Sequence, residues 1–305
     1  MLGLNLKTIV QSLSLIRLAF IPVSGSVRTL YRALADVNSL CSEKLYQNLG
    51  YWKAAPDSPD SPDSLDMAAE AMADLLARTA SLSRADEALD VGFGFADQDI
   101  FWAEKYQPRI ICGVNISPEQ VARARARIRE RGLIDRVLLE EGDATRLRFS
   151  DSSFDVVTAM ESAFHFRSRE NFFREAWRVL RPGGRLVMAD LASTSEPLSL
   201  RDRLAGTIGR SFWQIPKENL YPASIYQKKL EDCGFVAVDV RSIWRDVYPP
   251  FVKFALARLK DRELAERMNP LFRRMLMTSL KTRRRLSSDA MDYVLVSAVK
   301  PVKPA

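Results

Sequence analysis

The sequence predicts an α/β protein built on a doubly wound, mostly parallel sheet of seven strands. Short apolar runs of β type alternate with helical stretches between residues 88 and 189. Continuous apolar strands joined by helices are typical of a parallel sheet that is covered on both faces. The length of 305 residues and the apolar share of 47% supply enough material for a real hydrophobic core.

The expected strands are the apolar runs themselves. In chain order they are residues 88–91, 110–114, 137–140, 154–160, 185–189, 236–243 and 293–299. The clearest helix between them spans residues 118–131, because Pro118 suits the first helical position and Ser117 can cap the helix. A long helical insertion is expected between the last two strands.

The chain before the first strand is expected to form helices and an exposed linker. Residues 1–55 have a helical pattern that ends in the aromatic stretch Tyr46–Trp52, and the threefold Pro-Asp-Ser repeat of residues 56–64 is typical of a linker. Ser64 is the expected N-cap of a helix that ends near Ser83. The predicted organisation is a helical cap and linker (1–64), an α/β core (65–192), and cap helices with the last two strands (193–305).

The charge distribution is uneven and narrows the possible partners. The net charge is +7, and residues 251–285 alone hold eleven Lys or Arg residues against Asp261, Glu263 and Glu266. A basic excess confined to one segment does not indicate a general nucleic-acid footprint, so no nucleic-acid partner is expected. The segment suits a cap with a solvated charged face, peripheral contact with an anionic membrane surface, or attraction of an acidic acceptor such as a diphosphate.

Cysteine and histidine usage argues against a disulfide scaffold and a metal site. The three cysteines are widely spaced, and His165 is the single histidine, whereas histidine-based metal sites need two or three imidazoles. The apolar residues 8–24 are split by Arg17 and are too short and too charged to span a bilayer. We therefore expect no metal and a cytoplasmic location, with attachment to the inner membrane surface as the alternative.

The glycine-rich loop after the first strand is the expected ligand site, because ligands of open parallel sheets lie beyond the carboxyl ends of the strands. The loop has the sequence Leu89-Asp-Val-Gly-Phe-Gly-Phe-Ala-Asp-Gln98. Asp97 stands where a dinucleotide-binding loop needs its third glycine, and the carboxylates of Asp97 and Asp99 would repel a pyrophosphate at the start of the next helix. The loop therefore indicates a cofactor without phosphates.

This loop resembles the first motif of class I S-adenosylmethionine-dependent methyltransferases. Four later segments follow in the order of that family, at residues 113–120, 141–144, 154–165 and 180–184. The resemblance implies a Rossmann-like domain that binds S-adenosylmethionine. It assigns Asp90, Gly92 and Gly94 to the methionine end, Asn115 and Gln120 to the ribose, and Ile116, Asp143 and Ala144 to the adenine. Two positions depart from the family: Asn115 replaces an acidic residue, and Ala96 replaces a third glycine.

Three further segments resemble one branch of the family. The Glu-Ser pair followed by His165, the stretch Tyr46–Trp52, and Tyr248-Pro-Pro250 are similar to segments of bacterial enzymes that methylate polyketides, glycosylated natural products, quinols and isoprenoids. The resemblance implies a small hydrophobic acceptor. The Asn/Asp-Pro-Pro-aromatic tetrad of base methyltransferases is absent after the fourth strand, where Ser162-Ala-Phe-His165 stands instead.

The predicted reaction is transfer of a methyl group to a hydroxyl of a hydrophobic natural product. His165 is the expected general base, because it follows the end of a strand, and Asp190 at the end of the next strand is expected to hold its other ring nitrogen. Glu161 is a third catalytic candidate, which could remove a proton or stabilise a cation in the alternative reaction, carbon methylation of an isoprenoid or quinol. A non-catalytic binding protein on the same fold is the remaining alternative.

Overall fold

The computed structural model describes residues 40, 43–54, 63–194, 214–268, 270–285 and 291–302. The predicted helices of residues 1–39 and most of the Pro-Asp-Ser linker lie outside these described residues.

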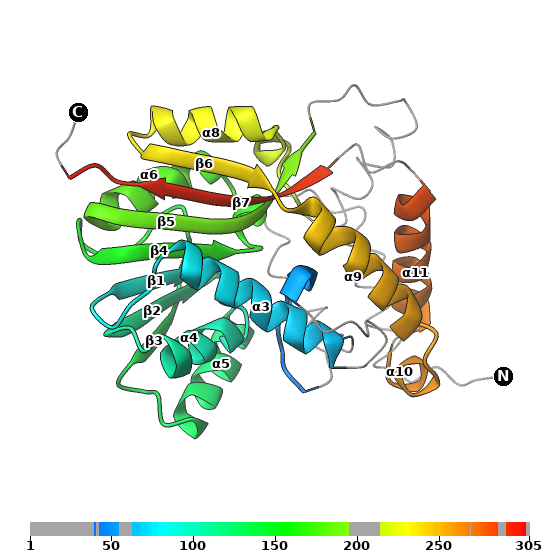
Figure 1. Ribbon diagram of the computed structural model, residues 1–305. Coiled ribbons are helices and arrows are strands. Elements are labelled where there is room, and N and C mark those ends of the chain that lie inside the picture. The colour runs from blue at the N-terminus through cyan, green and yellow to red at the C-terminus, as the bar shows by residue number, and fades with distance from the viewer. Residues whose placement is uncertain are drawn as a thin grey trace.

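A seven-stranded sheet in the order β3-β2-β1-β4-β5-β7-β6 forms the centre of the molecule (Figure 1). β7 is antiparallel to its neighbours β5 and β6, and all other pairs are parallel. The mostly parallel sheet predicted from sequence is therefore confirmed. The strands are β1 (Glu87–Val91), β2 (Ile110–Asn115), β3 (Val137–Glu141), β4 (Phe154–Met160), β5 (Leu180–Ser193), β6 (Val236–Ser242) and β7 (Met291–Val299).

The register of the parallel strands brings their carboxyl ends to one edge of the sheet. Val91 at the end of β1 pairs with Val114 near the end of β2, and Met160 at the end of β4 pairs with Ala189 of β5. Because the loops after these strands leave from the same edge, they can form a common site.

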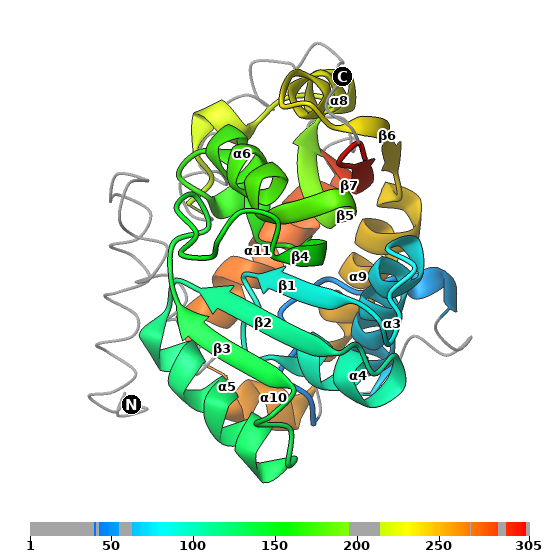
Figure 2. The same cartoon turned by 90° about the vertical axis from the view of Figure 1, so that its left-hand side faces the viewer.

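Helices cover both faces of this sheet, as Figure 2 shows for α3 and α6. The first face packs α3 (Ser64–Thr79), α4 (Asp97–Lys105) and α5 (Pro118–Glu130) against the sheet in one apolar cluster. The second face packs α6 (Arg169–Val179) and α8 (Ala223–Asp232) in another. The Ser117 side chain accepts a hydrogen bond from the N–H of Gln120, which confirms the predicted cap of α5.

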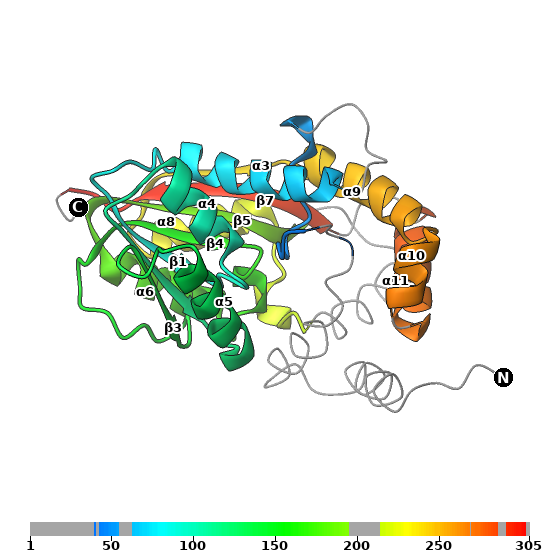
Figure 3. The ribbon, with the colours of Figure 1, turned by 90° about the horizontal axis from the view of Figure 1, so that it is seen from below.

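The insertion between β6 and β7 forms α9 (Trp244–Arg258), α10 (Arg262–Arg267) and α11 (Pro270–Arg285). These helices lie beyond the carboxyl ends of the parallel strands (Figure 1), and α9 lies on the same side of the sheet as α3 (Figure 3). Phe254 of α9 packs on Trp52 of the short 3-10 helix η1 (Trp52–Ala54), with 5.3 Å between ring centroids. Within the described ranges, no helix combines the length and the apolar run that crossing a membrane requires.

Two local expectations upstream of β1 are wrong. Residues 43–51 form no helix, because their hydrogen bonds go to α3: the N–H of Tyr51 donates to Ala68 O at 2.8 Å, and Asn48 Nδ2 donates to Ala69 O at 3.3 Å. Helix α3 has Asp63 rather than Ser64 at its N-cap and ends at Thr79. Residues 43–51 are called the strap below.

Candidate functional site

A cavity of about 700 Å³ opens at the carboxyl edge of the sheet. This volume falls within the range of small-molecule sites. The strap, the loops after β1, β2, β3 and β4, and residues 216–218 all contribute to its wall. Of the cofactor-binding residues predicted from sequence, the cavity is lined by Gly92, Gly94, Asn115, Ile116, Gln120, Asp143 and Ala144.

Two glycines shape the wall formed by the loop after β1. Gly92 has φ of +87°, and a Cβ at this position would lie 2.3 Å from the Cβ of Ser162. Gly94 has φ of +58°, and a Cβ there would lie 3.0 Å from Oε1 of Gln47 in the strap. Residues that carry a side chain rarely adopt such φ values, so glycine is favoured at both positions and the loop presents bare backbone to the cavity.

Asp90 lies in β1, next to this loop, and is not among the residues that line the cavity. Its carboxylate accepts hydrogen bonds from Gln98 Nε2 at 2.9 Å and from the hydroxyl of Thr158 at 2.8 Å. Burial raises the pKa of Asp90 to about 6. The structure thus gives Asp90 a supporting position behind the loop, and its assignment to the methionine end of the cofactor stays a prediction.

A chain of three amides lines the cavity near the end of β2. Asn115 Nδ2 donates to Gln120 Oε1 at 2.9 Å, and Gln120 Nε2 donates to Gln47 Oε1 at 2.7 Å. Amide groups can both donate to and accept from ribose hydroxyls, although they lack the paired oxygens of a carboxylate. Sequence reasoning missed Gln47, because its position in the wall depends on how the strap docks.

In the turn after β3, one carboxylate oxygen of Asp143 accepts hydrogen bonds from Thr145. Asp143 Oδ1 accepts from the N–H of Thr145 at 2.8 Å and from its hydroxyl at 2.7 Å. This arrangement fixes the carboxylate in the cavity wall beside Ala144. The position fits recognition of a donor such as an exocyclic amine.

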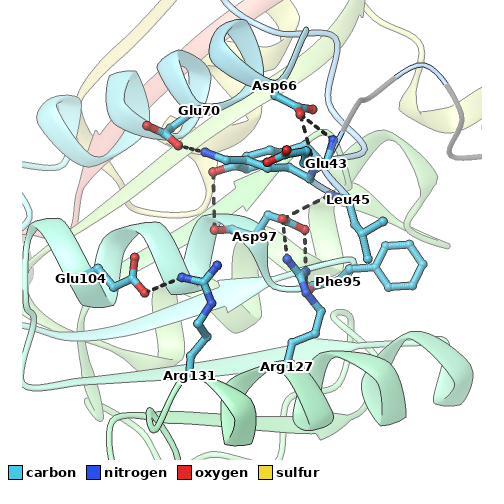
Figure 4. Close-up of polar contacts among 11 residues, drawn as sticks. Glu43, Leu45, Asp66, Glu70, Phe95, Asp97, Glu104, Arg127 and Arg131 are labelled. Carbon is cyan, nitrogen blue, oxygen red and sulfur yellow. Dashed lines mark hydrogen bonds and ion pairs between the residues drawn. The ribbon is translucent and has the colours of Figure 1, made fainter. Parts of the chain in front are cut away.

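Backbone and side-chain contacts dock the strap on α3 and α4 (Figure 4). Asp66 accepts from the N–H groups of Glu43 at 3.0 Å and Lys44 at 3.2 Å, and Asp97 accepts from the N–H of Leu45 at 3.2 Å. The guanidinium of Arg127 holds Asp97 through two hydrogen bonds of 2.7 Å. Asp97 therefore anchors the strap and is not among the residues that line the cavity.

Glu161 and His165, two titratable side chains from the segment after β4, also line the cavity. Glu161 Oε1 accepts from the N–H of Leu49 at 2.6 Å and from the hydroxyl of Tyr293 at 2.7 Å. Burial raises the pKa of Glu161 to about 7. His165 ends the 3-10 helix η2 (Ala163–His165), and its ring lies 4.1 Å from that of Phe164.

Asp190 has different partners from those predicted. It is fully buried, and its carboxylate accepts from the N–H of Phe164 at 3.1 Å and from the hydroxyl of Tyr226 at 2.7 Å. Arg169, also fully buried, forms an ion pair with it at 3.1 Å. A buried ion pair of this kind holds α6 against β5, so we correct the predicted role of Asp190 from orienting His165 to joining these elements. Nothing in the sequence pattern singled out Arg169.

From the sequence, aromatic residues outside the sheet could form a lid over the acceptor: Tyr46, Tyr51, Trp52, Phe166, Phe212, Trp213 and Tyr248. Tyr46 and Phe166 line the cavity, whereas Trp52 packs on Phe254 and Tyr248 stacks on Trp244 at 4.2 Å. Phe212 and Trp213 lie outside the described residues. Over the part of the chain that the structure describes, no cluster of three or more His, Cys, Asp or Glu side chains could hold a metal ion.

The chemistry of the wall fits S-adenosylmethionine. A mainly apolar cavity with a few converging polar groups is typical of a cofactor site, and its wall combines bare glycine backbone, neutral amides and a carboxylate. Gly92, Gly94, Asn115, Gln120 and Asp143 would hold the cofactor, and Glu161 and His165 would face the acceptor.

Comparisons with known proteins agree with this fit. A family model described as a methyltransferase domain matches residues 89–188. The chain is 35% identical over 287 residues to erythromycin 3''-O-methyltransferase of Saccharopolyspora erythraea, covering 91% of each chain. It is 30% identical to 27-O-demethylrifamycin SV methyltransferase of Amycolatopsis mediterranei, covering 92% of this chain and 98% of the relative.

Solved structures share the fold. The [4+2]-cyclase SpnF matches with a TM-score of 0.71 at 25% identity, covering 92% of this chain and 97% of that one. Geranyl diphosphate C-methyltransferase from Streptomyces coelicolor matches with a TM-score of 0.67 at 17% identity, covering 92% and 100%. With identity of 30% or more to two methyltransferases over nine-tenths of its length, this chain belongs to the S-adenosylmethionine-dependent methyltransferases.

Proposed function

We propose that this enzyme transfers the methyl group of S-adenosylmethionine to a hydroxyl of a small hydrophobic natural product. The observation that carries the proposal is a cavity whose wall includes both the cofactor-fitting residues and Glu161, His165 and residues 216–218. A methyl donor and an acceptor can meet only where their sites are continuous. The names of the relatives that cover nearly the whole chain support oxygen as the methylated atom.

When bound, S-adenosylmethionine supplies a methyl group on a positively charged sulfur. The residues of the chain position the reacting atoms, exclude water from the cavity and supply a proton acceptor. The strap and the loop after β1 close two sides of the cavity, and alignment of the reacting atoms can supply ~7 to 11 kcal/mol of the barrier. A general base contributes on the order of 10² to 10⁴ in rate, and Glu161 and His165 are the two candidates.

The proposal also assigns a role to each of three segments of the chain. Residues 65–192 would bind the cofactor, residues 1–64 would cap it, and residues 193–305 would shape the acceptor site. The strap residues Leu45–Asn48 support the second assignment because they line the cavity. Residues 216–218 support the third for the same reason. The cytoplasmic location and membrane contact stay predictions, which flotation with anionic liposomes tests.

A carbon methyltransferase acting on an acidic acceptor is the second candidate. Arg167 and Lys217 line the cavity and are exposed, and within the described ranges neither forms an ion pair. Two exposed cations in the cavity wall would suit a diphosphate. Glu218 lies in the same wall and partly offsets their charge, which is why we place the hydroxyl acceptor first.

Binding of S-adenosylhomocysteine, measured by calorimetry, tests the cofactor assignment. Asp143→Ala should weaken binding about tenfold, equivalent to ~1.4 kcal/mol. Asp151→Ala is the matched control, because Asp151 is an exposed carboxylate that does not line the cavity. Absence of binding by the unaltered protein would leave only the non-catalytic alternative.

Mass spectrometry with isotopically labelled S-adenosylmethionine tests the acceptor class. The panel includes 27-O-demethylrifamycin SV, other hydroxylated macrocycles, quinols and geranyl diphosphate. Label on a hydroxyl oxygen supports the proposal, whereas label on carbon of the isoprenoid or quinol would replace it with the second candidate.

A further inference from the structure

The Glu161 carboxylate is held between the cavity and β7, the last strand of the chain. Tyr293 lies on β7, is fully buried, and donates its hydroxyl hydrogen to Glu161 Oε1 at 2.7 Å. The N–H of Leu49 in the strap donates to the same oxygen at 2.6 Å. Oε2 accepts no hydrogen bond from any residue that the structure describes. One oxygen is therefore anchored, while the other stays available in a residue that lines the cavity.

The backbone also constrains this side chain. Glu161 has φ of +49°, a left-handed conformation that a residue with a Cβ rarely adopts. Its N–H donates to Ala189 O at 2.8 Å, and the next residue, Ser162, donates its hydroxyl to Val91 O at 2.7 Å. Strained backbone that is fixed by its neighbours often occurs at functional sites.

The surroundings of Glu161 bring its titration close to neutrality. Burial is the largest effect and raises the pKa to about 7, whereas the two hydrogen bonds from Leu49 and Tyr293 lower it and the buried charge of Asp190 raises it. A proton acceptor works best when its pKa lies near the working pH, because it is then available in the ionised form and still basic.

We infer that Glu161 accepts the proton of the acceptor hydroxyl during methyl transfer, and that Tyr293 is the positioning residue that presents Glu161 to the cavity. This inference rests on the proposed function. In the step, the hydroxyl oxygen forms a bond to the methyl carbon, and the carbon–sulfur bond breaks with its electron pair going to sulfur. The hydroxyl proton passes to Oε2 of Glu161. The sulfonium charge and the carboxylate charge disappear together, so the overall charge is balanced.

Infrared difference spectroscopy of the full-length protein, without cofactor or acceptor, tests the position of Glu161. The unaltered protein should show a protonated carboxyl band that titrates near pH 7, and Glu161→Gln should lack this band. Tyr293→Phe removes one hydrogen bond from the ionised form, so the midpoint should rise by roughly one to two pH units.

A matched control separates this effect from general loss of packing. Tyr226→Phe also removes a buried hydroxyl that donates to a carboxylate at 2.7 Å, but its partner is Asp190. We expect the Glu161 midpoint to stay unchanged in this variant. A midpoint that is equal in the unaltered protein and Tyr293→Phe would overturn the positioning role. So would identical carboxyl titrations of the unaltered protein and Glu161→Gln, because the other buried carboxyl near neutrality, Asp90, contributes equally to both.

Single-turnover transfer to the member of the panel with the strongest labelling tests the proton transfer itself. The transfer rate should increase with pH, and the midpoint of this increase should equal the Glu161 midpoint from the infrared titration. Tyr293→Phe should shift both midpoints by the same amount. His165→Gln should keep the midpoint. A rise that moves with His165→Gln and not with Tyr293→Phe would assign the proton to His165. Failure of S-adenosylhomocysteine to bind would contradict the proposed function separately, because the infrared titration needs no ligand.

Discussion

Gly92 is the residue of the loop after β1 at which a side chain should be least tolerated. Its φ of +87° disfavours any Cβ, and that Cβ would lie 2.3 Å from the Cβ of Ser162. Gly132 has a similar φ of +67°, but a Cβ added there would meet no heavy atom within 4 Å. We expect Gly92→Ala to lower the free energy of unfolding by roughly 2 to 5 kcal/mol and Gly132→Ala by about 1 kcal/mol, measured by urea denaturation.

The double variant Gly92→Ala with Ser162→Gly separates collision from backbone strain. Removing the Ser162 side chain removes the closest atoms, so part of the lost stability should return. Equal losses for Gly92→Ala and Gly132→Ala would show that the collision does not matter.

Glu161 should make the stability of the protein fall between mildly acidic and neutral pH. Its pKa rises from 4.5 in the unfolded chain to about 7 in the fold, so the folded state binds the proton more tightly. The free energy of unfolding should therefore decrease as pH rises from 4.5 to 7, by at most roughly 3 kcal/mol. Glu161→Gln should remove this part of the decrease, measured by urea denaturation at pH 5 and pH 8. An unchanged pH dependence would contradict the raised pKa.

The place of a single residue in the site was predictable from sequence when the residue belongs to a motif. It was not predictable when only the fold brings the residue to the site. Gly94 and Gln120 follow strand ends in a recognisable order, and both line the cavity. Gln47 and Tyr293 come from segments far along the chain, and no periodicity marks them. Asp190 shows the opposite case: it was predicted at the end of a strand, but its buried partner Arg169 gave it a different role.

Among the structural elements, the strap should depend on the ion pair that anchors it. Arg127 is one-quarter exposed and holds Asp97, which in turn accepts from Leu45 of the strap (Figure 4). Arg127→Met keeps the aliphatic stem and removes the charge. We expect it to lower the affinity for S-adenosylhomocysteine about three- to tenfold, because the strap lines the cavity and loses its anchor. Calorimetric titration measures this change.

Arg131, the C-cap residue of α5, provides the matched control. It pairs with Glu104 at 3.1 Å, and both side chains are at least half exposed, so the pair adds little to stability. Arg131→Met should bind S-adenosylhomocysteine like the unaltered protein. If both variants bind alike, the anchor does not act through the strap.

The strands were more predictable than the segments around them for a physical reason. A buried parallel strand such as β1 or β4 is apolar over most of its length, whereas β6 and β7 form an antiparallel pair and β6 is largely exposed. All seven expected strands are present with shifts of a few residues at their ends. The exception is β5, which begins at Leu180 because the turn before it joins the strand through an irregular register. The strap satisfies its backbone through α3, so local propensity misplaced it, whereas the helical insertion between the last two strands was predicted correctly.

At the scale of the whole molecule, the segment just after the strap and the insertion before β7 pack together on one side of the sheet. Trp52, just after the strap, and Phe254 in the insertion belong to the same apolar cluster as α3 and α4. The sequence predicted the sheet and the place of the insertion, but not this contact, because no pattern relates segments so far apart. Leu276, Met277 and Leu280 of α11 pack against this cluster as well. The insertion is thus part of the core on the face that carries the strap.

Replacing Phe254 with alanine should therefore disturb the cavity in addition to the core. Phe254 and Leu230 are both fully buried, but Leu230 belongs to α8 on the opposite face. Each change to alanine should lower the free energy of unfolding by about 2 to 5 kcal/mol, because each leaves a void in a packed core. At a temperature where both variants stay folded, only Phe254→Ala should weaken binding of S-adenosylhomocysteine, since Trp52 and the strap lose their support. Denaturation and calorimetry on the same samples measure both effects. Equal weakening by Leu230→Ala would mean that general destabilisation, rather than the contact between the insertion and the strap, controls the site.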